Sequence, residues 1–264
     1  MAGLYEAAID TVLKMRGVQP KYIASTATIR MAHDQVRRLY GRELAVFPPP
    51  GLSCDDSYFA RTVPISERAG RIYVGYLAPM LNRQQCMAPL AAALLVAPDV
   101  VFKDQLNQEE LLEAWWTQVI YHGSLKGVGN SHNAFNIDVR DALARFNQEL
   151  RQQERDFPDE SSGPLSPRTT VRIAQLTSIS SAEENARTFS RLEQARDHPD
   201  CLDAVLATNM VSVGLDVSRL ALMIINGQPL TTAEYIQASS RVGRSQVLGI
   251  RKFLSRPSTK FVAL

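Results

Sequence analysis

The clearest periodic pattern of apolar and polar residues lies in the second half of the chain. Residues 182–195 carry apolar side chains at helical spacing, and Ser180 and Ser181 each precede a glutamate by three residues. That order is typical of a capping box in front of an amphipathic helix. Residues 202–209 and 220–226 are nearly continuous apolar runs, which are typical of strands in a parallel sheet covered on both faces. This half therefore predicts alternating strands and helices.

The same alternation continues toward the N-terminus with shorter and less regular runs. Apolar and β-branched residues predict strands in 21–28, 44–47, 71–76, 118–122 and 171–177, and helical spacing predicts helices in 31–39, 84–96, 109–116 and 138–154. Two segments rich in Pro, Gly and Ser, 48–51 and 157–168, indicate loops. Strands alternating with helices favour a doubly wound α/β fold, in which ligands gather at the carboxyl ends of the strands.

Composition and charge are typical of a globular protein but do not identify its function. The chain has 264 residues, of which 45% are hydrophobic and 21% charged, and its formal net charge is only +2. Positive charge is concentrated at the C-terminal end, where no acidic residue follows Glu234. Three scattered cysteines favour neither a disulfide framework nor a zinc site. With no signal-peptide pattern, and no apolar run long enough for a bilayer, we expect a cytoplasmic protein without a membrane span.

The C-terminal segment QASSRVGR carries the first candidate chemistry. Thr231 and Glu234 have capping-box spacing, so residues 234–240 are expected to be helical. On such a helix Gln237, Arg241 and Arg244 would project from one side, because they follow one another at spacings of four and three. Guanidinium groups donate paired hydrogen bonds to phosphate oxygens. The alternative is a solvated helix end whose arginines only interact with the helix dipole.

A second candidate segment, ATNMVSVGLDV, spans residues 207–217. The predicted strand ends at Thr208 and Asn209, and Gly214 and Asp216 follow after a short linker. This order places a flexible backbone position and a carboxylate near the carboxyl end of the strand. The alternative is a tight turn whose aspartate only caps the next helix.

Together, ATNMVSVGLDV and QASSRVGR resemble motifs V and VI of superfamily-two helicases, nucleic-acid-dependent ATPases built from two RecA-like domains. The segment STAT, at residues 25–28, resembles motif III of that family, which couples nucleotide state to nucleic acid. The amino-acid sequence of residues 206–244 most resembles the large helicases of DISARM-type phage-defence systems. One departure is Ser240, which stands where the family usually has glycine.

The resemblance implies a role for each matching residue. It implies that the arginine fingers, which reach the γ-phosphate of ATP, are Arg241 and Arg244. It further implies that ATP is bound by Gly214, Asp216, Gln237, Arg241 and Arg244. It also implies that Thr208 and Asn209 contact the DNA or RNA backbone. Ser25, Thr26, Ala27 and Thr28 would form the coupling motif.

Two motifs that such a motor needs are missing from this sequence. It contains no Gly-Lys dipeptide for a phosphate loop, and its one Asp-Glu pair, residues 159–160, lies in the Pro/Ser-rich loop. Gly123 to Asn130 only superficially suggests a phosphate loop and is expected to be an ordinary flexible loop. We therefore expect ATP and Mg²⁺ to act in the full-length protein, with neither stably bound to this chain alone and with no metal site in it.

The domain organisation follows from the order of the motifs. We expect residues 1–60 to be the end of a first RecA-like domain and residues 61–264 to be the second one, with an insertion around 77–168. The missing first domain would then be a partner. Two other functions stay open: a nucleic-acid-binding module that uses the basic residues 245–264, and an α/β enzyme for small molecules. That basic segment is equally compatible with a truncated or disordered end.

Overall fold

The chain divides into two compact units, residues 1–63 and 64–264. The structure is a computed structural model, and it describes residues 2–26, 31–49, 51–53, 56, 59–64, 66–67, 70–103, 105–156, 168–209, 216–244 and 260–263. Three predicted site residues, Ala27, Thr28 and Gly214, lie outside the described residues.

The smaller unit contains two helices, α1 (Ala2–Met15) and α2 (Ala32–Tyr40). Asp10 of α1 accepts a hydrogen bond from Arg42 at 2.6 Å, and the ring of Tyr22 lies 5.3 Å from that of Tyr40. None of the residues described between 1 and 63 is buried. These helices therefore have almost no core among the residues that are described.

The strands expected in residues 21–28 and 44–47 are not found where the structure describes those ranges. Residues 21–26 and 44–47 have neither strand nor helix geometry. A β-prone run becomes a strand only when a neighbouring strand takes up its backbone hydrogen bonds. Among the described residues of this unit, only the bridge between Asp56 and Arg61 pairs in that way.

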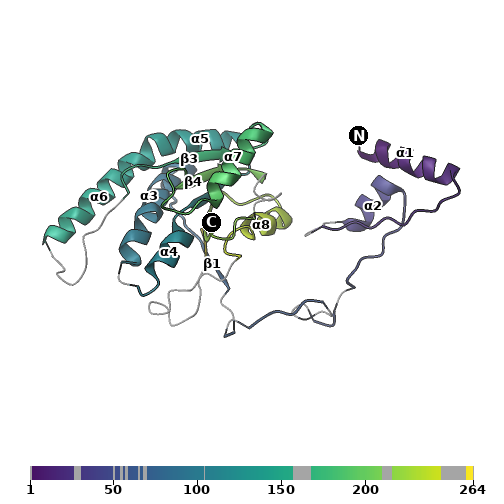
Figure 1. Ribbon diagram of the computed structural model, residues 1–264, viewed down its shortest axis with the longest axis horizontal. Coiled ribbons are helices and arrows are strands. Elements are labelled where there is room, and N and C mark those ends of the chain that lie inside the picture. The colour runs from purple at the N-terminus through teal and green to yellow at the C-terminus, as the bar shows by residue number, and fades with distance from the viewer. Residues whose placement is uncertain are drawn as a thin grey trace. The chain divides into compact units, whose positions relative to one another are not determined.

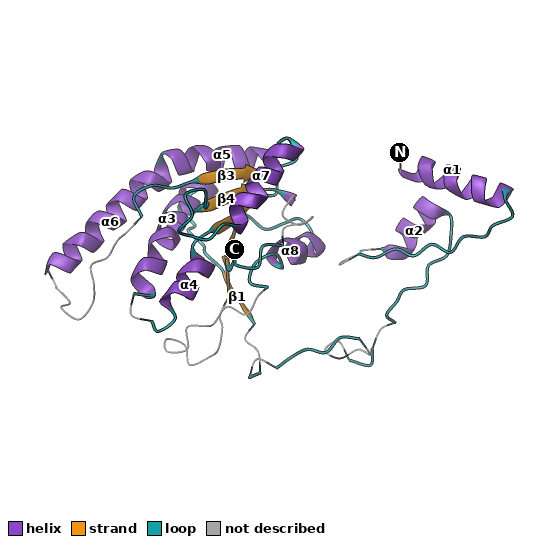
Figure 2. Ribbon diagram, viewed as in Figure 1, coloured by secondary structure: helices purple, strands orange, loops and turns teal. Residues whose placement is uncertain are grey.

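The larger unit is built on one parallel sheet (Figure 2). Its strands run in the order β1-β6-β5-β2-β4-β3, and every paired neighbour is parallel. Their bounds are β1 Arg71–Val74, β2 Gln118–Tyr121, β3 Ile173–Leu176, β4 Ala204–Ala207, β5 Leu222–Ile225 and β6 Lys260–Ala263. The last strand comes from the basic C-terminal segment, so residues 260–263 belong to the sheet.

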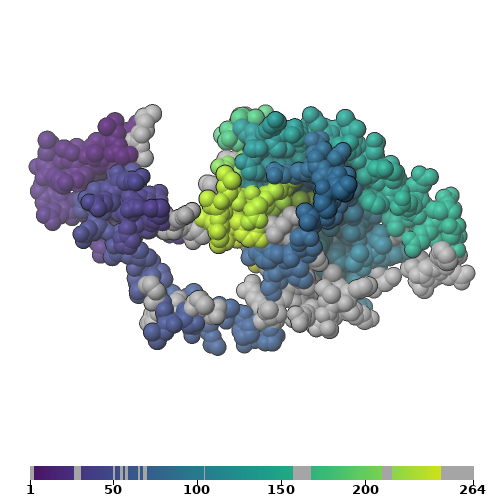
Figure 3. Space-filling model, turned by 180° about the vertical axis from the view of Figure 1, so that it is seen from behind, coloured from purple at the N-terminus to yellow at the C-terminus, as the bar shows by residue number. Residues whose placement is uncertain are grey.

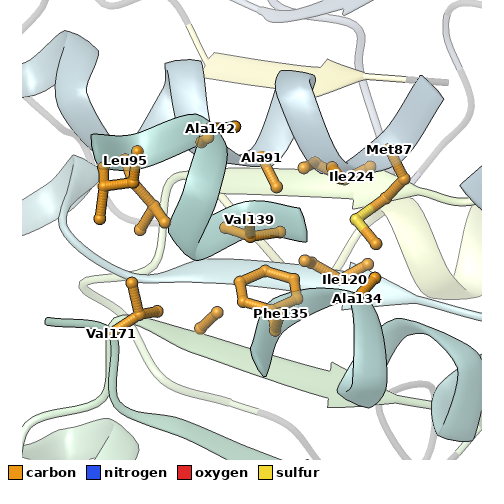
Figure 4. Close-up of a cluster of buried hydrophobic side chains, with 14 of the residues drawn as sticks. Met87, Ala91, Leu95, Ile120, Ala134, Phe135, Val139, Ala142, Val171 and Ile224 are labelled. Atoms are coloured by element: carbon orange, nitrogen blue, oxygen red, sulfur yellow. The ribbon is translucent and has the colours of Figure 1, made fainter. Parts of the chain in front are cut away.

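Helices cover both faces of the sheet, as the predicted doubly wound fold requires (Figure 1). One face packs against α3, α5 and α6, and the other against α7 and α8. Side chains alternate along β2, so that Ile120 faces the first layer and Val119 the second. Figure 4 shows Ile224 beside Met87 and Ile120 beside Phe135 in this core. The bounds are α3 Arg83–Val101, α4 Gln108–Trp115, α5 Leu125–Asn136, α6 Asp138–Asp156, α7 Ala182–Glu193 and α8 Thr232–Ser239.

Two predictions about the middle of the chain are wrong. Residues 77–168 are not an insertion, because β2 lies inside this range and pairs with both β4 and β5 at the centre of the sheet. Gly123–Asn130 is not a loop either, since α5 begins at Leu125 and the Ser124 side chain caps it by accepting from the Gly127 N–H at 3.2 Å. Two glycines in its first turns concealed this helix.

Helix α3 is, by length and composition, the one described helix that could cross a membrane. Its buried residues other than Pro98 nevertheless belong to the core cluster that covers one face of the sheet. It begins at a complete capping box formed by Asn82 and Gln85. The helix is therefore accounted for by packing within the domain.

Candidate functional site

Three strand ends are tied together at the carboxyl edge of the sheet. The backbone N–H of His122, just after β2, donates to the Ala207 carbonyl at the end of β4 at 2.8 Å. Asn226, just after β5, donates its N–H to the Tyr121 carbonyl at 2.9 Å. Segments that follow these strands are consequently held side by side, where a doubly wound sheet places its ligands.

The two candidate arginines lie in a turn beyond α8 and not on the helix. Helix α8 ends at Ser239, so the expected helical spacing of Gln237, Arg241 and Arg244 is wrong. Gly243 adopts a left-handed φ of 61° and donates its N–H to the Leu220 carbonyl at 2.6 Å. A right-handed helix cannot continue through a residue with left-handed backbone angles. Glycine adopts such angles readily because it has no side chain.

The arginine turn, residues 240–244, is fixed to the body of the domain from two sides. Val242 is fully buried in the core on the α7 and α8 face of the sheet. Arg71 of β1 donates to the carbonyls of Val242 at 3.0 Å and Ser240 at 3.3 Å. Sequence inspection missed Arg71, because about 170 residues separate it from the turn. Its position at the start of a predicted strand was the only available signal.

The turn brings Arg244 against Asp216, so the two candidate motifs meet. The Arg244 guanidinium donates to the Asp216 carboxylate at 2.6 Å, and its Nε donates to the Ser240 carbonyl at 3.1 Å. The two side chains remain 35% and 75% exposed. Partial burial and the nearby charge of Arg244 lower the pKa of Arg241, and Asp216 opposes that shift.

The remaining predicted residues that the structure describes have different surroundings. Thr208 is buried, and its hydroxyl has no hydrogen-bond partner among the described residues. Asn209 is exposed. The backbone carbonyl of Gln237 accepts a hydrogen bond from the Ser240 hydroxyl at 3.1 Å. Ser25 and Thr26 are exposed residues of the smaller unit.

Helix α8 is held by a contact that differs from the predicted capping box. Thr231 caps the helix by accepting from the Glu234 N–H at 3.2 Å. The Glu234 carboxylate, however, accepts a hydrogen bond of 2.5 Å from the hydroxyl of Tyr121 at the end of β2. Burial, followed by this carboxylate, raises the pKa of Tyr121. Tyr121 thereby ties the central strand to the helix that leads into the arginine turn.

His122, at the carboxyl edge of the sheet, should make the unfolding free energy of the domain depend on pH. Burial, followed by the positive charge of Arg83, lowers the pKa of His122 from 6.5 to about 4. Because the unfolded chain binds the proton more tightly, stability is complete above about pH 6.5 and falls as the pH drops toward 4. Between pH 7 and 5 we expect His122 to account for a loss of about 2 kcal/mol in unfolding free energy.

Urea unfolding at both pH values, on the wild type and on His122→Asn, measures this contribution. The variant should lose about 2 kcal/mol less than the wild type over the same interval. An equal loss in both proteins would show that His122 is not the group responsible.

The family comparison decides the class of the larger unit. The family described as helicase conserved C-terminal domain matches residues 159–246, a range that includes β3, β4, β5, α7, α8 and the arginine turn. This chain carries a helicase C-terminal domain. The predicted RecA-like α/β class is confirmed by that match together with the parallel sheet and its flanking helices.

The helicase C-terminal domain also has a curated relative of much greater length. The chain is 35% identical over 230 residues to "DISARM protein DrmA" of Bacillus paralicheniformis, a match that covers 87% of this chain and 19% of that protein. The chain therefore spans about a fifth of the length of this relative. The predicted resemblance to DISARM-type helicases is confirmed at the level of homology.

Solved helicase structures align with the chain at low similarity. The DUF1998 helicase MrfA bound to DNA and AMPPNP aligns over 99% of this chain and 27% of that chain, with 13% identity and a TM-score of 0.49. Dbp5 of S. cerevisiae bound to RNA and ADP BeF3 aligns over 97% and 48%, with 10% identity and a TM-score of 0.45. The fold assignment rests instead on the strand order and the family match.

Proposed function

We propose that this chain is the C-terminal motor portion of an ATP-dependent nucleic-acid helicase or translocase. The observation that carries the proposal is the contact of Arg244 with Asp216 on a turn that Arg71 of β1 anchors to the body of the domain. Two motifs separated by 28 residues thus present two guanidiniums and a carboxylate at one place. This geometry supports a nucleotide site completed by another domain.

The donor set of the turn fits a triphosphate. Arg241 and Arg244 would approach the γ-phosphate, and Asp216 and Gln237 would lie beside the nucleotide, with Gly214 as a further contact. ATP supplies the phosphoryl group, and the guanidiniums would neutralise the charge that develops on it. Since Arg244 is partly exposed in its pair with Asp216, it can exchange the carboxylate for a phosphate at small cost.

Nucleic acid is the second proposed partner. Thr208 follows β4 directly, at the carboxyl edge of the sheet, and its position there supports a contact with the nucleic-acid backbone. Asn209, the next residue, is exposed and can reach the same strand. Both DNA and RNA suit such backbone contacts.

We assign residues 1–60 to the end of a preceding RecA-like domain, with residues 25–28 as the coupling motif. In support, no described residue of this part is buried, while α1 exposes apolar side chains that a larger domain would cover. These are Leu4, Tyr5, Ile9, Val12 and Met15. The missing part of that domain would supply the phosphate loop and the magnesium ligands. A cytoplasmic location completes the proposal.

ATP hydrolysis by the chain alone and by the full-length protein tests this assignment. The chain alone should hydrolyse no ATP, with or without added oligonucleotide, because the groups that hold the β- and γ-phosphates are absent from its sequence. The full-length protein should hydrolyse ATP faster when nucleic acid is present. Hydrolysis by the isolated chain, or none by the full-length protein, would refute it.

A further inference from the structure

Helix α6 presents three arginines along one face. Arg140, Arg151 and Arg155 follow one another at spacings of eleven and four, which places them within about 60° of each other around the helix. Together with Gln148 and Thr169 they line a surface cavity of about 400 Å³. All three arginines are exposed. We call these three residues the arginine face.

Among the described residues, no carboxylate pairs with the arginine face. Neither Arg140 nor Arg151 forms an ion pair with any residue that the structure describes, and Arg155 donates to the neutral Gln152 at 2.8 Å. Two exposed acidic residues of α6, Glu149 and Asp156, lie on another side of the helix, where they share a separate hollow with Arg145. Such a separation of charge favours an anionic partner.

A buried polar group opens into the same cavity. Asn147 is only 7% exposed, and its amide nitrogen donates to the Arg168 carbonyl at 2.6 Å. Its amide oxygen accepts no hydrogen bond from the described residues, although it is buried. This oxygen is an acceptor, as phosphate oxygens are, so the cavity's contribution to anion binding comes from its guanidinium donors.

The arginine face is separate from the proposed nucleotide site. Helix α6 packs with α3 and α5 on one face of the sheet, whereas α8 and Val242 of the arginine turn pack on the other. Figure 1 shows α6 extending beyond α5, and Figure 3 shows its teal surface at one end of the larger unit. A molecule bound there would not occupy the space beside Asp216 and Arg244.

We propose that the arginine face is a second nucleic-acid contact, which binds the phosphate backbone outside the motor cleft. Nucleic acid suits it because the donors are spread along the helix: Arg140 and Arg151 are about 16 Å apart, and Arg151 and Arg155 about 6 Å. Several successive phosphates match such a row better than one small anion does. The inference rests on the proposed function, since it takes nucleic acid as the partner of the whole protein.

Salt-dependent binding of the complete 264-residue chain to a labelled 20-nucleotide single strand, followed by fluorescence anisotropy, tests the proposal. Arg140→Gln combined with Arg151→Gln should weaken binding about tenfold at low salt and reduce the slope of log K against log salt by about 1.4. Arg145→Gln is the matched control for Arg151→Gln, because it removes the same charge from another side of the same helix. It should leave affinity within about twofold of the wild type.

The possible outcomes separate this proposal from the proposed function. If the wild type binds and the double variant binds equally well, the arginine face is refuted while the helicase assignment stands. If the wild type binds no oligonucleotide at any salt concentration, the arginine face is refuted as a nucleic-acid contact, whereas the helicase assignment is decided by ATP hydrolysis in the full-length protein. Binding of polyglutamate as tight as that of the oligonucleotide, with the same loss in the double variant, would indicate an acidic protein partner and overturn the nucleic-acid proposal.

Discussion

Replacing Arg241 or Arg244 with alanine in the full-length protein should lower nucleic-acid-stimulated ATP turnover by about 10³-fold or more. An arginine that neutralises the transferring phosphoryl group typically contributes that much to the rate. The fold should survive, because Val242 and Arg71 still anchor the arginine turn when either side chain is removed. Steady-state hydrolysis at saturating oligonucleotide measures the effect, and thermal unfolding of each variant checks the fold.

Two further variants make this test specific. Arg244→Lys keeps the positive charge but loses the planar fork, so its turnover should also fall well below that of the wild type. Arg145→Ala removes an exposed arginine on α6 and should change turnover by less than about twofold, in line with the small effects of most surface substitutions. Normal turnover in Arg241→Ala and Arg244→Ala would refute their role as arginine fingers.

Substitution of Asp203 by asparagine should destabilise the larger unit by about 3–5 kcal/mol. Asp203 is 2% exposed and lies between two arginines. Its carboxylate accepts from the Arg172 backbone N–H at 2.6 Å and is 3.3 Å from the Arg168 guanidinium. That guanidinium is 4% exposed and stacks 3.4 Å from the centre of the Trp116 ring. Burial lowers the pKa of Arg168 to about 10, with Asp203 opposing the shift.

The expected loss arises because asparagine leaves a buried guanidinium without its counter-charge. Urea unfolding gives the change in unfolding free energy. Glu183→Gln is the matched control: it breaks the pair of Glu183 with Arg187 on α7, where both side chains are at least 70% exposed. That loss should stay below about 1 kcal/mol. Equal losses in the two variants would contradict a structural role for the buried pair.

Local signals in the sequence were sufficient for most elements of the larger unit. The capping box of Ser181 and Glu184 forms as predicted and starts α7. The continuous apolar runs become β4 and β5, which are buried throughout. Such features depend on neighbours within four residues or on burial of a whole segment, so one sequence carries them. Helix α5 was not predicted, because Gly127, which lies close to the His122 side chain, has a low helix propensity.

Motif spacing also predicted which segments would meet, but not how. The sequence placed Asp216 and Arg244 near one edge of a sheet, and they are in contact. It placed Arg244 on a helix, whereas the chain leaves α8 at Ser239 and turns at Gly243. The roles of these residues and of Thr208 remain predictions until the variants are measured.

By itself, then, the sequence determined the alternation of strands and helices, their burial and the motifs at the strand ends. Only the tertiary structure decided the strand order, the central place of β2 and the anchoring of the arginine turn. The anchors join residues far apart in the chain: Arg71 bonds Val242 across 171 positions, and Tyr121 bonds Glu234 across 113. Contacts of that kind depend on how whole elements pack, and no local pattern of residues encodes them.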